Sequence, residues 1–212
     1  MNEVYDESYF LRGKETGKSL YTNYRWMPDL TIPMCEAIVN HCRINKGAHV
    51  LDFGCARGYT VKALRALGYD AYGLDCSEWA IDNCDPDVRD FVEHGGVITP
   101  YDTYEWVIAK DVLEHVEDAK FVTECFMEVA TAGIFVVVPL ALKDFDKRYV
   151  IRNYDKDITH IHRLTLASWA EMFMVPGWSV EASYRLPGVK DNYWKPGWEK
   201  GNGFLTCRRL SD

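Results

Sequence analysis

A strand, a glycine-bearing turn and a helix follow one another directly in the first third of the chain, and this order constrains the fold more than any other feature. His49–Phe53 is a short apolar run, Gly54–Gly58 is built mostly from small residues, and residues 59–67 carry apolar side chains on one side of a helix. Gly68 supplies the C-terminal stop of that helix. Such a unit must bury its apolar faces in a sheet covered by helices.

The same alternation continues along the chain. Further strands are expected at residues 70–74, 97–98, 105–109 and 133–138, and helices at residues 31–42, 77–83, 118–130 and 166–173. The last two strands, residues 178–184 and 204–209, have no helix between them, and residues 1–30 read as a cap with short helical pieces. The pattern predicts an α/β fold with a Rossmann-like, mostly parallel sheet, an antiparallel last strand and helices on both faces.

The bulk composition fits one globular domain and argues against several kinds of partner. With 212 residues, the chain is long enough for one α/β domain, in which residues 1–45 form an N-terminal cap and helix and residues 46–212 form the core. The net charge of −8 disfavours nucleic acid, which is bound by basic surfaces. The longest apolar run, residues 133–142, is too short to cross a bilayer, so no membrane contact is expected.

The cysteines indicate a reducing compartment. The chain has seven, and no two of them stand at the C-x-x-C spacing typical of zinc or redox sites. No apolar run near the N-terminus precedes a cleavage site. We therefore expect reduced thiols and a cytoplasmic protein, while the oligomeric state is not defined by the sequence.

The turn after the first strand carries a ligand-binding pattern. Gly54 permits a tight turn, and Ala56 and Gly58 permit the close approach of a ligand. The G-x-A-x-G spacing differs from the G-x-G-x-x-G of dinucleotide-binding proteins. With the preceding Asp52, it resembles the first motif of class I S-adenosylmethionine (SAM) methyltransferases, D-x-G-x-G-x-G, with Ala56 in place of a glycine. The resemblance implies that the loop lies under the methionine part of SAM and that Asp52 contacts its amino group directly or through water. A purely structural strand–turn–helix is the alternative.

An acidic residue ends the second strand. Asp75 lies 23 residues after Asp52. A carboxylate at this place can accept hydrogen bonds from both hydroxyls of a ribose, in SAM proteins and in NAD proteins alike. The acidic residue that many family members carry after the third strand has no counterpart in residues 94–99, so the adenine pocket is not assigned.

A third motif follows the fourth expected strand. Residues 111–115, Asp-Val-Leu-Glu-His, resemble the D-x-L-E-H stretch of methyltransferases that act on sugars, quinones and other metabolites. In order and spacing, the resemblance covers residues 45–209, and it implies a class I methyltransferase sheet with SAM as cofactor. The residues expected at SAM are Asp52, Gly54, Cys55, Ala56, Gly58, Tyr59, Asp75, Cys76 and Lys110, with Tyr24 and Arg25 of the N-terminal cap.

Three residues, His115, Asp111 and His162, are candidates for the chemistry. An alcohol must lose its proton during methyl transfer, and an imidazole titrates near neutral pH, so His115 is the first candidate for the base. His160 and His162 alternate and would share one face of a strand, from which one of them could reach the site. The alternatives are a His115 that only packs and a solvated pair of histidines.

A metal site is a further hypothesis. The small-RNA 2′-O-methyltransferases, which belong to the same broad family, use E-x-x-E-H and a distant histidine to hold magnesium, and this chain has D-x-x-E-H. The resemblance implies Asp111, Glu114, His115 and His160 as ligands of Mg²⁺ or Mn²⁺, to which mixed carboxylate and imidazole ligation is suited. The same motif is also common without a metal.

Aromatic residues make up 14% of the chain and gather in the N-terminal segment and at residues 193–198. Both segments would flank the carboxyl end of the sheet in this family, where rings can cover SAM or stack on a flat or sugar-like acceptor. Residues 23–26 are a candidate cap on the cofactor, in which Arg25 could meet a carboxylate. Simple packing of the rings onto the core is the alternative.

These observations predict a SAM-dependent O-methyltransferase that acts on a hydroxyl of a sugar or another small molecule. The first alternative is N-methylation of an amine or a protein side chain, but residues 110–113, Lys-Asp-Val-Leu, lack the N/D-P-P-aromatic motif of such enzymes. The others are a non-catalytic SAM-binding module and a nicotinamide oxidoreductase, which the glycine spacing disfavours.

Overall fold

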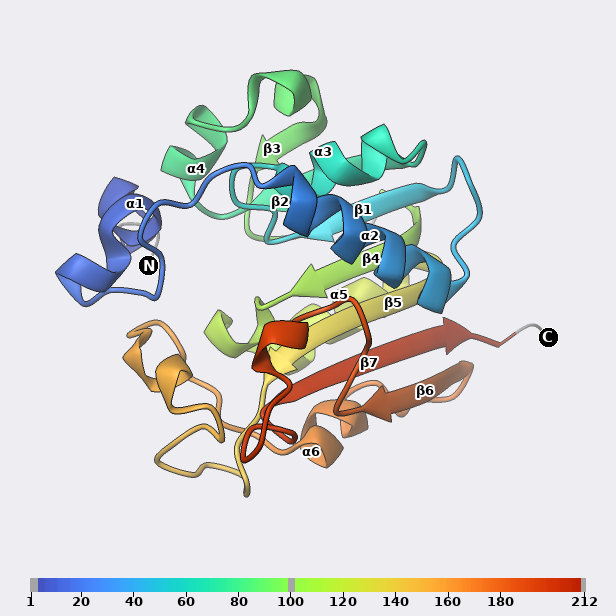
Figure 1. Cartoon of the computed structure of the whole chain (residues 1–212). Helices are drawn as coiled ribbons and strands as arrows, with labels where there is room; N and C mark the ends of the chain where they lie inside the picture. Colours follow the sequence, from blue (N-terminus) through green and yellow to red (C-terminus); the bar gives the residue numbers. More distant parts are fainter. Residues whose placement is uncertain (1–3, 99–101, 211–212) are drawn as a thin grey trace.

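A computed structural model describes residues 4–98 and 102–210, and the strands in this part of the chain form one seven-stranded sheet in the order β3-β2-β1-β4-β5-β7-β6 (Figure 1). Strands β1 to β5 pair in parallel, whereas β7 runs antiparallel to both β5 and β6. This arrangement confirms the predicted fold class, including the antiparallel last strand. The strands are β1 His49–Phe53, β2 Asp70–Asp75, β3 Val92–His94, β4 Tyr104–Lys110, β5 Ala130–Pro139, β6 Trp178–Ser183 and β7 Asn202–Arg209.

Helices cover both faces of the sheet. On one face, α2 and α3 pack over β1 and β4, and the buried side chains there include Ile38, Leu64 and Ile108. On the other face, α5 and α6 pack over β4 and β5, around Phe126 and Trp169. Successive residues of a strand point to opposite faces, so each central strand feeds both cores. The helices are α1 Glu7–Thr16, α2 Pro28–Cys42, α3 Tyr59–Ala66, α4 Glu78–Asp82, α5 Ala119–Val129 and α6 Leu166–Glu171.

The third strand is not where the sequence placed it. The prediction at Val97–Ile98 was wrong, because β3 is formed by Val92–His94, which pairs with the end of β2. This strand lies at the edge of the sheet, where half-exposed and exposed side chains are tolerated, so it lacks the apolar run by which a central strand is recognised. Val97 is 67% exposed, and Ile98 packs into the core beside α5 without joining the sheet.

The carboxyl ends of the parallel strands are covered by two segments that are far apart in the sequence. One is α1 with the chain that follows it, and the other is the connection between β5 and α6, residues 140–165 (Figure 1). The two segments are joined by a hydrogen bond from the backbone N–H of Ile158 to the carbonyl of Lys18 (3.2 Å). Among the described residues, none of the helices has the length and apolar character needed to cross a membrane.

Candidate active site

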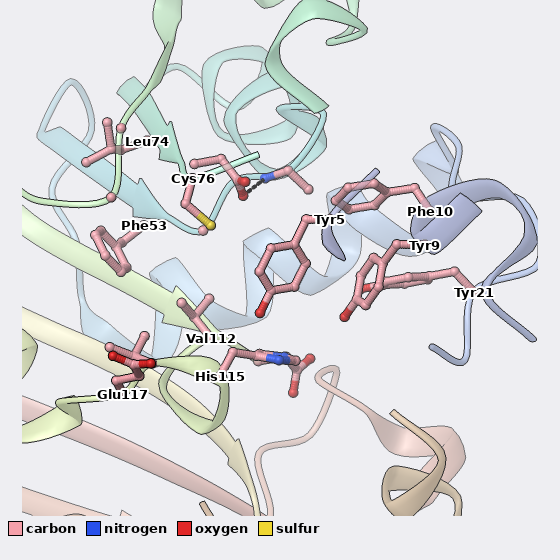
Figure 2. A pocket seen from close by; sticks show the side chains of 17 residues that line it. Tyr5, Tyr9, Phe10, Tyr21, Phe53, Leu74, Cys76, Val112, His115 and Glu117 are labelled. Atoms are coloured by element: carbon pink, nitrogen blue, oxygen red, sulfur yellow. Dashed lines mark hydrogen bonds between the residues drawn. The ribbon is translucent and has the colours of Figure 1, made fainter. Parts of the chain in front are cut away.

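A cavity of about 280 Å³ opens at the carboxyl ends of β1, β2 and β4, beneath α1 (Figure 2). Parallel sheets commonly bind ligands at this edge. Figure 2 shows three rings of the N-terminal segment, Tyr5, Tyr9 and Tyr21, on the side opposite Phe53, Leu74 and Cys76. The cavity is lined by Tyr5, Tyr9, Phe10, Tyr21, Phe53, Gly54, Ala56, Leu74, Asp75, Cys76, Gly95, Gly96, Asp111, Val112, His115, Val116 and Glu117.

The glycine turn shapes one wall of the cavity. Gly54 has a φ of 78°, and a β-carbon there would lie 2.3 Å from Cγ2 of Val112, so only glycine allows the turn to pack against the loop after β4. Ala56, at the position where the family usually has glycine, also has a positive φ, of 50°. The backbone N–H of Ala56 donates a hydrogen bond of 2.7 Å to Asp75, which holds this strained residue in place.

Asp75 is fixed by two backbone donors. Its Oδ2 accepts from the N–H of Ala56, and its Oδ1 accepts from the N–H of Ser77 at 2.8 Å. Burial raises the pKa of Asp75, while both of these hydrogen bonds oppose the shift. Each carboxylate oxygen can accept a second hydrogen bond, so the group is suited to the two hydroxyls of a ribose, as the sequence predicts.

Asp52 fits a cationic ligand. Its side chain is buried at the end of β1, with 3% of the residue exposed, and its Oδ2 has no hydrogen-bond partner among the described residues. Burial raises the pKa of Asp52 to about 7, although the nearby Lys110 opposes the shift. An unpaired buried carboxylate is costly, and a bound ammonium group such as that of SAM would supply the missing partner.

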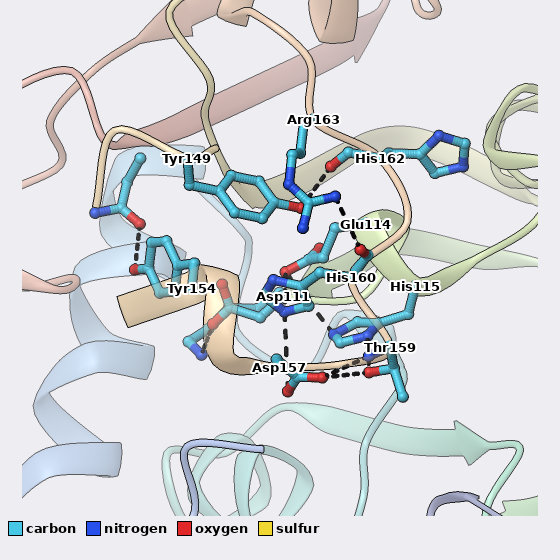
Figure 3. A network of polar contacts seen from close by, with 12 residues as sticks. Asp111, Glu114, His115, Tyr149, Tyr154, Asp157, Thr159, His160, His162 and Arg163 are labelled. Atoms are coloured by element: carbon cyan, nitrogen blue, oxygen red, sulfur yellow. Dashed lines mark hydrogen bonds and ion pairs between the residues drawn. The ribbon is translucent and has the colours of Figure 1, made fainter. Parts of the chain in front are cut away.

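A chain of hydrogen bonds orients His115 (Figure 3). The hydroxyl of Thr159 donates to Oδ1 of Asp157 at 2.5 Å, and Nδ1 of His115 lies 2.8 Å from the same hydroxyl oxygen. The single hydrogen of the hydroxyl is committed to the carboxylate, so the oxygen must accept from an Nδ1–H. The Nε2 atom of the neutral ring then keeps a free lone pair. Burial lowers the pKa of His115, which favours this neutral form.

Glu114 and His160 lie beside His115 and complete a possible metal-binding set. One ligand atom from each of the three residues lies within 4.8 Å of the others. Glu114 is 1% exposed, and neither its Oε2 nor Nδ1 of His160 has a partner among the described residues. Burial raises the pKa of Glu114 well above its usual value and, together with the neighbouring His115, lowers the pKa of His160 to about 4.

Asp111 lies outside this set, although the sequence predicted it as a fourth metal ligand. Its φ is 58°, and its two carboxylate oxygens pair with different lysines, Oδ2 with Lys110 at 2.6 Å and Oδ1 with Lys190. Burial would raise the pKa of Asp111, but the two lysines hold it below its usual range. The pairing leaves Asp111 ionised and neutralised at the cavity wall.

Several other predicted residues do not reach the cavity. His162 lies in a loop and not on a strand, so it does not share a face with His160. Its Nε2 is 2.7 Å from the carbonyl of Val116, and Figure 3 shows the ring turned away from Glu114 and His115. The catalytic role predicted for His162 therefore has no support in the geometry. Arg25 is exposed and does not line the cavity, so its expected contact with the cofactor has no support in the geometry either.

Most of the remaining residues expected at SAM do not line the cavity but pack behind the residues that do. Gly58 caps α3, and the side chain of Cys55 packs under β2, where a β-carbon on Gly73 would collide with it. Tyr24 and Tyr59 pack against each other at 5.2 Å between ring centroids. Of the predicted set, Gly54, Ala56, Asp75 and Cys76 line the cavity directly. The unassigned adenine segment ends at Thr99, which lies outside the described residues.

Residues that the sequence did not reveal complete the site. Asp157 and Thr159 orient His115, and Lys190 holds Asp111 from the connection between β6 and β7. The D-x-T spacing of residues 157–159 is a local signal for a turn in which the carboxylate binds the chain two residues on, as it does here at 3.0 Å. No signal in the local sequence predicts that Thr159 of this turn contacts His115.

Comparisons with known proteins agree with this geometry. Residues 33–183 match the family model described as a methyltransferase domain, which is well over half of the chain. A search of the curated proteins finds no match.

Solved structures share the fold at low sequence identity. A chain of the complex of the Haloferax volcanii Trm112 methyltransferase activator is 17% identical, with a TM-score of 0.67, and the alignment covers 100% of this chain and 99% of that one. The magnesium protoporphyrin IX methyltransferase of Synechocystis PCC 6803 with bound SAM is 17% identical, with a TM-score of 0.56 and coverage of 84% and 79%.

The plantazolicin methyltransferase in complex with a triazolic desmethylPZN analog and S-adenosylhomocysteine (SAH) is 12% identical, with a TM-score of 0.63 and coverage of 87% and 86%. These likenesses concern the fold, and the family match concerns the sequence. Taken with the glycine turn, the carboxylate of Asp75 at the cavity and the buried carboxylate of Asp52 in β1, they show that the chain belongs to the methyltransferase domain family and is a class I SAM-dependent methyltransferase.

Proposed function

We propose that the enzyme transfers the methyl group of SAM to a hydroxyl oxygen of a sugar or another small molecule. The observation that carries this proposal is the placement of His115, which lines the same cavity as Gly54 and Asp75 and whose Nε2 is left free by the chain of hydrogen bonds from Asp157. A neutral alcohol needs a base when it attacks the methyl group, whereas a neutral amine does not need one before attack.

The lining of the cavity supports an uncharged acceptor. The acidic groups that line it are Asp75, Glu117 and Asp111, of which Asp111 is already paired with Lys110 and Lys190. No lysine or arginine lines it among the described residues. A phosphate or carboxylate acceptor would be repelled there. Aromatic rings on the opposite wall offer the flat apolar surfaces on which sugars and aromatic compounds stack.

SAM, when bound, supplies an electrophilic methyl group, and the residues of the protein do the rest. Asp75 would hold the ribose hydroxyls, and Asp52 would pair with the amino group. His115 would accept the hydroxyl proton at Nε2 as the acceptor oxygen attacks. The rings of Tyr5, Tyr9 and Tyr21 would exclude water from the reacting atoms.

We further propose that Glu114, His115 and His160 can hold Mg²⁺ or Mn²⁺. The support is that one ligand atom from each of these residues lies within 4.8 Å of the others, with Oε1 of Glu114 4.0 Å from Nε2 of both His115 and His160. Oε2 of Glu114 and Nδ1 of His160 are also buried without partners among the described residues. A cation there would polarise the acceptor hydroxyl. His115 uses Nε2 in both roles, so it serves either as ligand or as base.

A cytoplasmic location is proposed as well, since all seven cysteines are unpaired thiols.

The test combines an acceptor screen with metal removal. Sugars, phenols and amines are incubated with methyl-labelled SAM, and the products are compared with and without EDTA. Label in methoxy groups supports O-methylation, and label on nitrogen contradicts it. Activity that EDTA abolishes and Mg²⁺ or Mn²⁺ restores supports the metal role, whereas activity that EDTA leaves intact assigns His115 to the role of base.

A further inference from the structure

The N-terminal segment, residues 4–26, connects the cofactor side of the cavity to His115. On the cofactor side, the hydroxyl of Ser77 donates to the carbonyl of Tyr5 at 2.6 Å, and the same Ser77 binds Asp75 through its backbone N–H. On the other side, the hydroxyl of Tyr9 donates to Oδ2 of Asp157 at 2.8 Å. One short segment therefore contacts both Ser77, which donates to the residue that would hold the ribose, and Asp157, which orients His115 through Thr159.

We propose that Tyr9 is a positioning residue, which fixes the tautomer and the direction of His115 through Asp157 and Thr159 when the N-terminal segment covers the cavity. This inference rests on the proposed function, because it concerns the use of Nε2 of His115. The chain of contacts runs from the hydroxyl of Tyr9 to Asp157, from Asp157 to the hydroxyl of Thr159, and from there to Nδ1 of His115.

The two carboxylate oxygens of Asp157 accept hydrogen bonds from different residues. Oδ1 accepts from both the N–H and the hydroxyl of Thr159, and Oδ2 accepts from Tyr9. Nε2 of His160 lies 4.0 Å from the same Oδ2, beyond hydrogen-bonding distance. The hydroxyl of Tyr9 thus keeps the carboxylate turned toward Thr159. Without it, His160 is the nearest alternative partner for Oδ2.

Burial makes these hydrogen bonds effective. Tyr9 is 4% exposed and Asp157 is 6% exposed, so water cannot replace a lost partner at low cost. Groups that orient a functional histidine in this way typically contribute about 10- to 100-fold to activity or metal affinity. The segment also packs in a small cluster of its own, around Tyr9, Phe10 and Ala80, apart from the two main cores.

The first test reads the tautomer of His115 without any turnover. Nitrogen chemical shifts of the ring are recorded for the wild type, Thr159→Val, Thr159→Ser and Tyr9→Phe, each with bound SAH. The account predicts an Nδ1–H ring in the wild type and in Thr159→Ser, and a mixture of tautomers in Thr159→Val and in Tyr9→Phe. The same Nδ1–H signature in Thr159→Val would overturn the proposal.

The second test separates positioning from folding. Thr159→Val is expected to lower kcat by about 10- to 100-fold, and Thr159→Ser to restore it, while the affinity for SAH stays near that of the wild type. Tyr9→Phe keeps the ring in the cavity wall and is expected to lower kcat without raising KM for SAM. Tyr72→Phe, a change in β2 far from the cavity, is the matched control. The double variant Tyr9→Phe with Thr159→Val should be no worse than Thr159→Val alone, because both changes break one chain.

The outcomes distinguish this inference from the proposed function. If His115→Ala keeps full activity, the proposed function fails and the role of the chain fails with it. If His115→Ala abolishes turnover while Tyr9→Phe and Thr159→Val do not change kcat, the proposed function stands and the positioning role is refuted. A loss in Tyr9→Phe that adds fully to the loss in Thr159→Val would also refute it.

Discussion

Three aspartates at the ends of neighbouring strands differ in their surroundings, and these surroundings decide what each can do. Asp52 is buried without a partner for Oδ2, Asp75 accepts from two backbone N–H groups, and Asp111 is paired with two lysines. Of the three, only Asp52 has a buried oxygen without a hydrogen-bond partner among the described residues. An ammonium group that reaches this oxygen would relieve the cost of burying it.

Asp52→Asn is expected to stabilise the ligand-free enzyme and to weaken SAM binding. The folded-state pKa of about 7 lies above the ordinary value of 3.8, so Asp52 favours folding at low pH, and this contribution is lost as the pH rises from about 4 through about 7. The variant should lack this decline and be more stable at pH 8 by about 1–3 kcal/mol, the typical cost of a buried unsatisfied polar group. Urea unfolding at pH 5 and pH 8 measures the difference, and an unchanged pH dependence in the variant would contradict the assignment.

Asp75→Ala is expected to weaken SAH binding by about 100-fold, since hydrogen bonds to a charged group contribute about 1.5–3 kcal/mol each. Titration calorimetry with SAH measures the change. Asp82→Ala, on the exposed side of α4, is the matched control and should bind normally. Equal affinity of the two variants would remove Asp75 from the cofactor site.

At the scale of elements, the site depends on two connections that the sequence did not place. Residues 140–165 supply Asp157 and Thr159, and the connection between β6 and β7 supplies Lys190, which contacts Asp111, Tyr154 and Asn202. Neither connection has regular periodicity, and their paths follow from packing between distant parts of the chain.

Lys190→Met tests the role of the second connection. Lys190 is 9% exposed at its side chain and holds one oxygen of Asp111, while Lys110 remains on the other. We expect a loss of about 1–3 kcal/mol in the free energy of unfolding, because one buried partner of the carboxylate is removed. SAH affinity should not change, since Lys190 does not line the cavity. Lys195→Met, on the same connection but exposed, is the control. Equal stability of the two variants would contradict the argument.

The sequence predicted the elements that have strong local signals. β1 and β5 are apolar runs, and Ser77 caps α4 as expected, with its hydroxyl accepting from the N–H of Ala80. β3 was missed because an edge strand has no such run. α2 begins at Pro28, three residues before the predicted start, because proline suits the first turn of a helix.

The residues of the candidate site could be predicted where they belong to elements with strong local signals. Asp52 and Asp75 lie at the carboxyl ends of β1 and β2, and Gly54 follows β1, so the parallel fold brings them to one edge of the sheet. Glu114, His115 and His160 were expected near one another and do meet. The metal role of Asp111 and the shared face of His160 and His162 do not fit the structure for one reason: the direction of a side chain in a loop depends on partners such as Lys190 and the carbonyl of Val116, which are distant in the sequence. Asp111 does line the cavity, and its catalytic role stays a prediction.

At the scale of the whole molecule, the buried apolar side chains of the described residues form two large cores and two small clusters, one around Tyr149 and Tyr154 and the other in the N-terminal segment. The cores lie on the two faces of the sheet, whereas residues around Tyr9 and Phe10 pack separately over the cofactor side of the cavity. A segment with few buried contacts opens more readily than the rest of a protein. The N-terminal segment is therefore the part that a bound cofactor should order most.

Hydrogen exchange with and without SAH tests this expectation. The amide of Tyr24, bonded to the carbonyl of Phe10 at 3.0 Å, should exchange more slowly with SAH at a hundredfold excess over Kd, by up to about 2.7 kcal/mol in opening free energy. Amides of β6, at the far edge of the sheet, serve as the internal control. No slowing at Tyr24, or the same slowing in β6, would show that the segment does not close over the cofactor.

The central claim is that His115 promotes methyl transfer from SAM to a hydroxyl. The most direct measurement is a carbon NMR assay of the product formed from methyl-¹³C SAM and the best acceptor of the screen. The rates of the wild type and of His115→Ala are compared, after titration has shown that the two bind SAH with equal affinity. The account predicts a labelled methoxy product from the wild type and a rate lower by about 10²- to 10⁴-fold in the variant. Label on nitrogen or carbon, or an undiminished rate in His115→Ala, would contradict it.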